Sequence, residues 1–427
     1  MLRFASSPTG DMHISNLRVA LLNYIISKQL NEELLIRIDD INREKNIEGK
    51  DKEILETLAL FNIDYARVVY QSENIKYHTQ MAMKLLLDKK AFNCFCSDEA
   101  LEKDKEKAEQ EGKQYSYSGF CETISDETKF HCNAPFVVRL KKPNCPIKFH
   151  DLLLGDFSYE PCDVDSMIIL KHDKSPTYNY ASSIDDMLYD VSTILQEQEQ
   201  LSNTPKQIHI RDSLGYDKTI KYAHISSIVS LEGNEVPSVK YLIDEGYLPI
   251  AIANYLLLLG YTTTPKEIFT IEEAIEWFDI NQISKEAVKF DLNKLNAINK
   301  EYLHTMDELR LSKILGYADQ DIGKLAKVYL ENCNTIKEIK SKVDAIFNKK
   351  EDLEEYNNEL SIIKEYLATA PFINHFEDLK NHILKNTSLT EEKLTIPLYH
   401  ILTGEKTGPE LDKIYPLIKN YLGEIIK

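Results

Sequence analysis

The stretch FASSPTGDMHISNLRVALLNYI, residues 4–25, decides which fold we expect. An apolar beginning runs into the polar loop 6–13, and an amphipathic segment follows with His13 at its start. This order predicts a strand, a tight loop and a helix. Units of this kind expose backbone N–H groups at the helix N-terminus, where a phosphate can bind. Ser15 stands where glycine would allow a closer approach to the backbone.

The length and composition of the chain indicate a large soluble protein. Its 427 residues exceed one ordinary core, so we expect two to four domains. It has no apolar run of about 18 residues and no signal-peptide pattern, so we expect a cytoplasmic protein without a membrane span. The net charge of −18 argues against a basic surface for nonspecific nucleic-acid binding. A local basic track remains open at Lys206, Arg211, Lys218 and Lys221.

Strands and helices alternate in residues 1–60, where LLIRIDD (34–40) predicts a buried strand that ends in carboxylates. Such alternation predicts a parallel α/β sheet with ligands at the carboxyl ends of its strands. The same character returns in residues 166–195, for which we expect strand, turn, strand, helix and strand. The charged segment 98–113 predicts a solvated helix, and the chain after about residue 250 predicts helices almost throughout.

Four of the residues around position 100 have a spacing that suits a metal. Cys94-x-Cys96 is followed by Tyr117-x-x-x-Cys121. Three thiolates brought together by a short turn suit tetrahedral zinc, with one further oxygen or nitrogen donor. Seven cysteines in a long cytosolic chain do not indicate a disulfide framework. Buried structural thiols explain the spacing equally well, so both interpretations stay open.

The chain resembles the bacterial glutamyl-tRNA synthetases, a family of class I aminoacyl-tRNA ligases, in blocks that follow one another almost from end to end. The blocks are FASSPTGDMHISNLR (4–18), LLIRIDDINREKN (34–46), the spacing of Cys94, Cys96, Tyr117 and Cys121, DVDSMIILKHDKSPTYNYASSIDDML (163–188), LSNTPKQIHIRDSLGYDKTIKYAHI (201–225), YLIDEGYLPIAIANYLLLLGY (241–261) and KFDLNKLNAIN (289–299). No single block is decisive, but their ordered set is specific.

The resemblance implies a domain organisation and a reaction. The reaction joins ATP, used with Mg²⁺, and glutamate to form glutamyl-adenylate, and then transfers the glutamyl group to a tRNA(Glu) or tRNA(Gln) acceptor. The resemblance further implies a monomer and a structural zinc held by the four residues of the Cys/Tyr spacing. The implied domains are an α/β, Rossmann-type catalytic domain split between 1–60 and 166–250, an α+β insertion over 61–165 that binds the acceptor stem, a connecting helical domain over 251–300 and an all-α, helical anticodon-binding region over 301–427.

The resemblance also implies roles for individual residues. His13 and Asn16 match the first and last positions of the family's phosphate-binding HIGH-type loop, and Ser15 replaces a glycine against which the family packs adenine. Ordinary structure offers alternatives, namely an ion pair at a strand end for an arginine and an aspartate, and core packing for a tyrosine. The positions that match contacts to the amino-acid substrate are Arg3, Ser7, Asp39, Tyr178 and Asn179.

Two departures from the family pattern bear on activity. Gln196 occupies the place of the arginine that binds the glutamate side chain, and its neutral amide offers hydrogen bonds without charge. Losing such a charge-assisted pair costs on the order of a few kcal/mol and shifts preference toward a neutral side chain. After Glu235 the chain continues directly with VPSVKYL (236–242), so a KMSKS-like loop is missing, and Lys240 belongs to the helix that follows it.

These departures leave two functions open. One is a weakened glutamate–tRNA ligase. The other is a paralogue that binds tRNA or a protein partner without efficient activation of an amino acid. A third class, relatives that attach glutamate to a tRNA nucleoside, is disfavoured because such proteins usually lack a helical extension like the one expected after residue 300.

Overall fold

The computed structural model describes residues 1–112, 115–230, 236–351 and 353–426 and divides the chain into two compact units. The first unit comprises Met1–Val239 and Leu256–Phe290, and the second comprises Lys240–Tyr255 and Asp291–Lys427. The strands are β1 (Leu2–Ser6), β2 (Leu34–Ile38), β3 (Arg67–Tyr70), β4 (Ala91–Cys94), β5 (Val137–Leu140), β6 (Ile147–Asp151), β7 (Gly155–Tyr159), β8 (Ile168–Leu170), β9 (Thr193–Glu197), β10 (Lys221–Ile225), β11 (Ile228–Val229) and β12 (Val288–Lys289).

Helices and strands are interspersed as far as β10, and helices dominate the chain after it. Those up to β11 are α1 (Ile14–Leu30), α2 (Lys50–Leu60), α3 (Ile75–Leu87), α4 (Asp98–Gln110), α5 (Phe120–Thr123), α6 (Asp126–His131), α7 (Tyr178–Leu188) and α8 (Thr204–Leu214). The later ones are α9 (Val239–Asp244), α10 (Pro249–Leu258), α11 (Ile271–Trp277), α12 (Leu292–Thr305), α13 (Glu308–Leu315), α14 (Gln320–Tyr329), α15 (Ile336–Phe347), α16 (Asn357–Thr369), α17 (Phe376–Asn386), α18 (Glu391–Thr403), α19 (Leu411–Ile418) and α20 (Leu422–Ile425).

A seven-stranded sheet forms the centre of the first unit, with strand order β3-β2-β1-β9-β10-β6-β7. Neighbouring strands are parallel except for β7, which pairs with β6 as an antiparallel hairpin. All five residues of β2 are buried, as expected for a strand covered on both faces. The predicted parallel α/β sheet is therefore confirmed, with one antiparallel strand at its edge.

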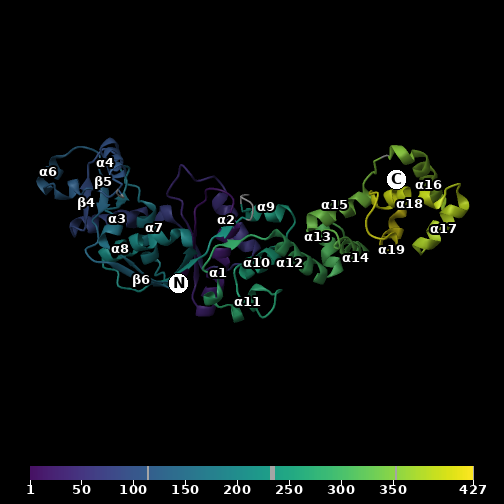
Figure 1. The fold of residues 1–427 in the computed structure, drawn as a ribbon, viewed down its shortest axis with the longest axis horizontal. Helices are drawn as coiled ribbons and strands as arrows, with labels where there is room; N and C mark the ends of the chain where they lie inside the picture. Colours follow the sequence, from purple (N-terminus) through teal and green to yellow (C-terminus); the bar gives the residue numbers. More distant parts are fainter. Residues whose placement is uncertain (113–114, 231–235, 352, 427) are drawn as a thin grey trace. The chain divides into compact units, whose positions relative to one another are not determined.

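The strand order reverses between β1 and β9, because β2 and β3 lie on one side of β1 whereas β9 and β10 lie on the other. Ligands of open parallel sheets bind outside the carboxyl ends of the strands at such a reversal. β1 ends at Ser6 and β9 ends at Glu197, so loop 7–13 and the segment after Glu197 flank this point. α1 begins directly after loop 7–13 and contacts β1, β2 and β9 (Figure 1).

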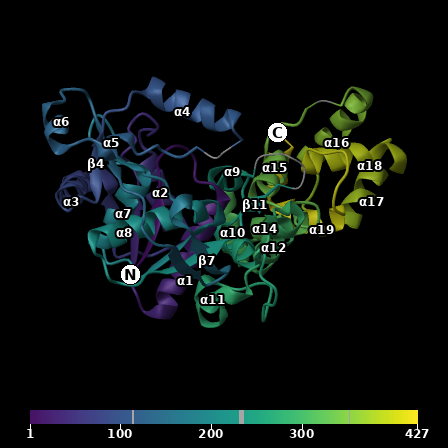
Figure 2. The same cartoon turned by 60° about the vertical axis from the view of Figure 1, so that its left-hand side comes forward.

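The range 61–165 contributes to two sheets. β4 and β5 form a three-stranded sheet with β8, in the order β4-β5-β8, whereas β3, β6 and β7 pair in the main sheet. Helices α3, α7 and α8 supply apolar side chains to the core around the small sheet. α4 has no buried residue and stands apart from the strands in Figure 2, which confirms the predicted solvated helix.

One predicted strand is wrong. Residues 171–177 were expected to include a second strand after β8, but the chain turns back so that Pro176 makes a single antiparallel bridge with Leu170. Lys174 adopts a positive φ of 65°, which favours a turn, and proline lacks the N–H group that would extend a ladder. The turn delivers the chain to Thr177, the N-cap of α7.

The second unit is built from helices around one apolar core, to which α12 to α20 contribute. Helices α16, α17, α18 and α19 lie together in this unit (Figure 1). α13 and α14 cross closely at Gly323, where an added Cβ would lie 1.9 Å from the carbonyl oxygen of Glu308. Among the described residues, none of the helices combines the length and the apolar character that crossing a membrane requires.

We expect the substitution Gly323→Ala to destabilise the second unit by about 1–3 kcal/mol, because the new methyl group must displace the backbone of α13. Urea unfolding followed by circular dichroism measures the loss. Gly423→Ala is the matched control, since Gly423 also lies in a helix but an added Cβ there meets nothing within 4 Å. Equal unfolding midpoints for the two variants would contradict the close crossing.

Candidate active site and metal centre

Loop 7–13 and the first turn of α1 bring His13, Ser15 and Asn16 together at the end of β1. His13 is the N-cap of α1 with an extended backbone, and its side chain makes no capping hydrogen bond. The loop is tied to the first residue of α9, because the N–H of Val239 donates to the carbonyl of Met12 at 2.8 Å. The three side chains are half-buried. They therefore lie where the backbone N–H groups of a helix N-terminus are available to an anion.

The point after Glu235 at which a KMSKS-like loop is expected directly follows residues 231–235, which lie outside the described residues. Lys240 lies in α9, as the sequence predicts, and donates to Asp244 at 2.9 Å. From Ile228 to Val239 the sequence contains no lysine, arginine or histidine, whereas Glu232 and Glu235 are acidic.

A buried network of two arginines and two aspartates connects β1, β2 and α7. Arg3 Nε donates to Asp186 Oδ1 at 3.2 Å, and Arg37 Nη1 donates to the same oxygen at 2.8 Å. Arg37 also donates to both oxygens of Asp39, at 2.6 Å and 3.3 Å. Each of the four residues is at most 7% exposed. Arg3 and Asp39, predicted as substrate contacts, thus lie in one network, but Arg37 takes the carboxylate of Asp39.

Burial and charge act in opposite directions on the two carboxyl groups. For Asp186, burial raises the pKa, but Arg3, Arg37 and Arg211 outweigh it and hold the pKa below its usual range. For Asp39, burial is the larger effect and raises the pKa, although Arg37 opposes it. Asp186 is therefore the ionised centre of the network.

Tyr178 and Asn179 begin α7 and serve different contacts. Tyr178 is 46% exposed, and burial, with the Asp39 carboxylate adding to it, raises the pKa of its phenol. The Asn179 amide donates to Asn203 at 3.0 Å and accepts from Gln207 at 3.1 Å, so it ties α7 to the start of α8. Ser7 is exposed at the end of β1.

Gln196 contacts a buried histidine, His224, that the sequence alone did not indicate as a candidate site residue. Its Oε1 accepts from Arg3 Nη2 at 3.4 Å, and its Nε2 lies 3.0 Å from His224 Nε2. His224 is register partner of Gln196 on the neighbouring strand, and its Nδ1 lies 2.6 Å from Asp151 Oδ2. A signal was present, since Asp151, Gln196 and His224 are polar residues near the carboxyl ends of three strands that prove to be neighbours.

The basic track that the sequence leaves open loses one of its four members. Arg211 is only 3% exposed and donates to the hydroxyl of Tyr222, and its guanidinium contributes to the field around Asp186. Lys218 pairs with Asp190 at 2.5 Å.

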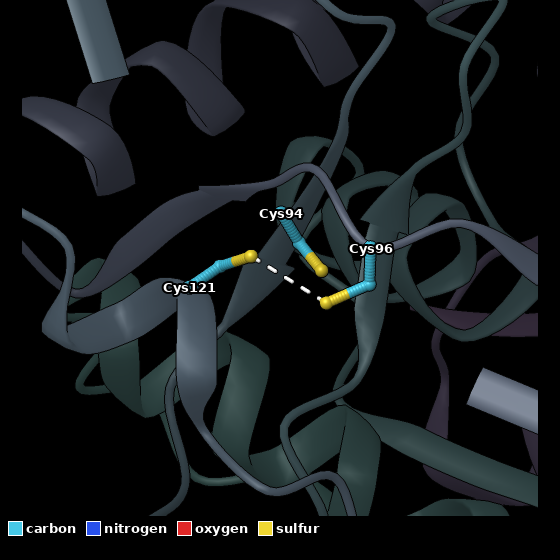
Figure 3. Close-up of side chains that lie close together, drawn as sticks. All are labelled: Cys94, Cys96 and Cys121. Carbon is cyan, nitrogen blue, oxygen red and sulfur yellow. Dashed lines mark hydrogen bonds between the residues drawn. The ribbon is translucent and has the colours of Figure 1, made fainter. Parts of the chain in front are cut away.

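The four residues of the predicted zinc set come together at the end of β4. The Sγ atoms of Cys94, Cys96 and Cys121 lie within 4.8 Å of one another and point toward a common centre (Figure 3). The Tyr117 hydroxyl lies 3.4 Å from Cys94 Sγ and 3.5 Å from Cys96 Sγ, and the Sγ atoms of Cys96 and Cys121 are 3.5 Å apart. Ligand atoms about 2.3 Å from a tetrahedral zinc are roughly 3.8 Å apart. Modest side-chain movement would let this cluster hold a metal ion.

The surroundings of the cluster suit thiolates. Arg139 lies over the ring of Tyr117, with 4.3 Å between the guanidinium carbon and the ring centroid, so a positive charge stands beside the sulfurs. For Cys94, burial raises the pKa, but hydrogen bonding with Tyr117, with the Cys96 backbone and with Arg139 outweighs burial and lowers the pKa. Burial raises the pKa of Cys96 to about 11, helped by the two other thiols. A bound cation would reverse that effect by stabilising the thiolate.

Comparison with known proteins shows extensive similarity. A model described as tRNA synthetases class I (E and Q), catalytic domain, matches residues 1–297. The chain is 48% identical to "Glutamate--tRNA ligase 2" of Sulfurimonas denitrificans and to "Glutamate--tRNA ligase 1" of Campylobacter jejuni, over 433 residues and 100% of each chain. These alignments are six positions longer than the 427 residues of this chain, so the chain lacks residues that these relatives have.

Solved structures show the same fold. The crystal structure of glutamate-tRNA synthetase from Elizabethkingia anophelis matches with a TM-score of 0.80 and 24% identity. A glutamate tRNA ligase from Elizabethkingia meningosepticum in complex with its amino acid matches with a TM-score of 0.81 and 23% identity. Both matches cover 100% of this chain and 98% of the other. The expectation of a Rossmann-type α/β protein with a helical C-terminal region is thereby confirmed.

We expect Asp186→Asn to destabilise the first unit by about 3–5 kcal/mol, because it leaves two buried arginines without their shared carboxylate. Asp190→Asn, which changes an exposed carboxylate paired with Lys218, should leave the unfolding midpoint unchanged. The folded pKa of Asp186 is lowered, so its contribution is complete above the unfolded value of about 3.9 and is lost as pH falls through the folded value. The difference between wild type and Asp186→Asn should therefore shrink in acid, and a difference that is constant with pH would contradict the ion pairs.

We expect the purified protein to contain zinc in a one-to-one ratio and to lose it in Cys94→Ser and Cys121→Ser, because each change removes a thiolate ligand. Elemental analysis of the purified variants measures the metal. Cys145→Ser, at an exposed cysteine outside the cluster, is the control and should retain the metal. Full zinc content in both cluster variants would exclude these ligands.

Proposed function

Because the chain belongs to the class I tRNA synthetases for glutamate and glutamine, we propose that it is a glutamate–tRNA ligase. It would form glutamyl-adenylate from ATP and glutamate and pass the glutamyl group to the terminal ribose of a tRNA. The observation that carries this proposal is 48% identity to curated glutamate–tRNA ligases over the whole chain. A reaction with ATP and tRNA belongs in the cytoplasm.

We assign ATP binding to the beginning of α1. Backbone N–H groups there, together with His13 and Asn16, would hold the phosphates, and the helix dipole favours their negative charge. Ser15 lies in the same turn and puts a side chain where a glycine would leave the backbone bare. We expect this change to weaken the contact with the adenine base rather than with the phosphates.

The amino acid would bind beside the arginine–aspartate network. Asp39 would accept a hydrogen bond from the substrate ammonium through an oxygen that Arg37 already orients. The Arg3 guanidinium, the Tyr178 hydroxyl and the Gln196 amide face the same region, and Ser7 lies at its edge at the end of β1. Asn179 would act indirectly, through its hydrogen bonds to Asn203 and Gln207.

Adenylate formation needs little covalent help from the protein. The substrate carboxylate attacks the α-phosphate, so the chain contributes by positioning the reactants and by stabilising charge on the phosphates. Mg²⁺, when bound with ATP, would neutralise part of that charge. His13, as the N-cap residue of α1, and Asn16 in its first turn would serve the phosphates. Between Ile228 and Val239 the sequence offers no cation to stabilise the leaving pyrophosphate.

The missing cations favour a second candidate, a paralogue that binds tRNA without efficient activation. Each absent donor at the phosphates is expected to cost about a hundredfold to a thousandfold in rate. The six additional positions in the alignments with the curated relatives agree with a loop that this chain lacks. We therefore propose slow activation as the property that separates this chain from its relatives.

We propose that residues 61–165 contact the acceptor stem and that the helices from 301 to 427 contact the anticodon region, with 251–300 connecting them. A cavity of about 720 Å³ beside the cysteine cluster supports the first assignment, because its lining includes Lys89, Lys90, Lys141 and Lys142. Lysines attract a phosphate backbone. A zinc bound by Cys94, Cys96, Tyr117 and Cys121 would brace this wall of the cavity, to which Tyr117 also belongs. As a closed ligand set, it would be structural.

ATP–pyrophosphate exchange with glutamate and tRNA present tests the proposed function. We expect exchange at least about a hundredfold slower than for the Campylobacter jejuni relative, because the cations for the leaving group are missing. Replacing residues 231–238 by the corresponding segment of that relative should restore much of the rate.

Exchange at the rate of the relative would refute the impairment. Undetectable exchange together with retained tRNA binding, measured by filter binding, would favour the paralogue. His13→Ala in the loop-restored protein is the control, since it should remove the restored activity if α1 binds the phosphates.

A further inference from the structure

Gln196 is held from both sides by buried partners. Its Oε1 accepts a hydrogen bond from Arg3, at 3.4 Å, and its Nε2 lies 3.0 Å from His224 Nε2. His224 is 1% exposed and Gln196 is 7% exposed, so water does not replace these contacts. The orientation of the amide therefore depends on which nitrogen of His224 carries the proton.

The partners of His224 determine its tautomer. Asp151 is fully buried and accepts from the backbone N–H groups of Leu153 and Leu154, at 3.0 Å and 2.9 Å. Burial raises the pKa of Asp151, but His224 and these N–H groups outweigh it, so the carboxylate is ionised. It accepts a hydrogen bond from the Nδ1–H group of His224 at 2.6 Å. The single lone pair of His224 Nε2 is then shared by the Gln196 amide and the Thr204 hydroxyl, each at 3.0 Å.

Arg3 excludes the other tautomer of His224, in which Nε2 carries the proton. If His224 Nε2 carried a proton, Gln196 would have to turn its oxygen toward His224 and its NH₂ group toward the Arg3 guanidinium, which has donors only. The observed network is consistent only with the NH₂ group toward His224 and the oxygen toward Arg3. This leaves Gln196 with one unused N–H donor and one unused lone pair.

The charges of this region do not favour an added anion. The buried arginines Arg3, Arg37 and Arg211 act on the carboxylate of Asp186, and Arg3 and Arg37 also act on Asp39. Asp185, which accepts from Gln71 and Asn74, acts on Arg37 as a further negative charge. Bringing a carboxylate side chain into such a buried region costs free energy unless a net positive charge meets it. A carboxamide avoids that cost because it needs only a donor and an acceptor.

We infer that the amino-acid site accepts an uncharged carboxamide side chain, so that glutamine binds at least as tightly as glutamate. Gln196 is the specificity-determining residue, because its free N–H and its free lone pair complement the carbonyl and the NH₂ of a carboxamide, whereas a carboxylate offers acceptors only. His224 and Asp151 are positioning residues that fix the amide of Gln196. The inference rests on the proposed function in one respect, namely that these residues form the amino-acid site.

Isothermal titration of the full-length protein with L-glutamine and with L-glutamate, with and without tRNA, tests this inference. We expect the dissociation constant for glutamine to be no larger than that for glutamate. Gln196→Arg should tighten glutamate binding about tenfold or more and weaken glutamine binding. Gln198→Arg, which adds the same charge two residues later, is the control and should leave the ratio of the two constants unchanged.

The role of His224 is tested by the ratio of the dissociation constants for glutamine and glutamate, rather than by the value of either constant. His224→Ala should weaken glutamine binding relative to glutamate binding, because the Gln196 amide is then free to rotate. His224→Gln, which can again accept from Gln196, should recover part of the ratio. If His224 were merely structural, both affinities would fall together.

Tighter binding of glutamate than of glutamine by the wild type would overturn the inference, as would the absence of glutamine binding with and without tRNA. Binding is measured apart from catalysis, so the two proposals can fail separately. Glutamine binding without any pyrophosphate exchange would leave this inference standing and reject the ligase. Normal pyrophosphate exchange with glutamate and no glutamine binding would reject this inference and leave the ligase proposal standing.

Discussion

The shared carboxylate of Asp186 is the interaction on which the first unit depends. Arg3 and Arg37 are buried arginines on neighbouring strands, and both donate a hydrogen bond to the same oxygen of Asp186. Arg37 also donates to Asp39. Buried ion pairs seldom stabilise a fold more than apolar residues of the same size would. The network fixes charged groups of β1, β2 and α7 relative to one another, beside the reversal of strand order between β1 and β9.

The sequence predicted those parts of the molecule whose cause is local. The strand, loop and helix in residues 4–25 follow from an apolar run, turn residues and an amphipathic period, and all three are present. The Cys-x-Cys turn lies on a short connection after β4, so the cysteines could be placed together from their spacing. Local chemistry also explains the one wrong strand, since Pro176 breaks the ladder after a single bridge.

The parts that the sequence did not predict depend on contacts between distant segments. Asp151 and His224 are 73 residues apart, and nothing near either of them indicates that β6 will lie beside β10. Asp39 was expected to contact the amino-acid substrate, yet Arg37, two residues before it, binds its carboxylate. Arg211 was one of four cations left open as a basic track, but it is buried against Tyr222. In each case pairing across elements decided the role of a charged residue.

The departures at the candidate site share one physical direction. A neutral amide stands at Gln196, and the segment from Ile228 to Val239 holds acids but no cation. Both changes reduce the positive charge that would meet an anion, one at the amino-acid side chain and the other at the pyrophosphate. The first turn of α1 and the cysteine cluster, by contrast, depend on backbone N–H groups and thiols rather than on cationic side chains. An ordered Gln196–His224–Asp151 arrangement with little positive charge beside it is what the inferred carboxamide ligand would need.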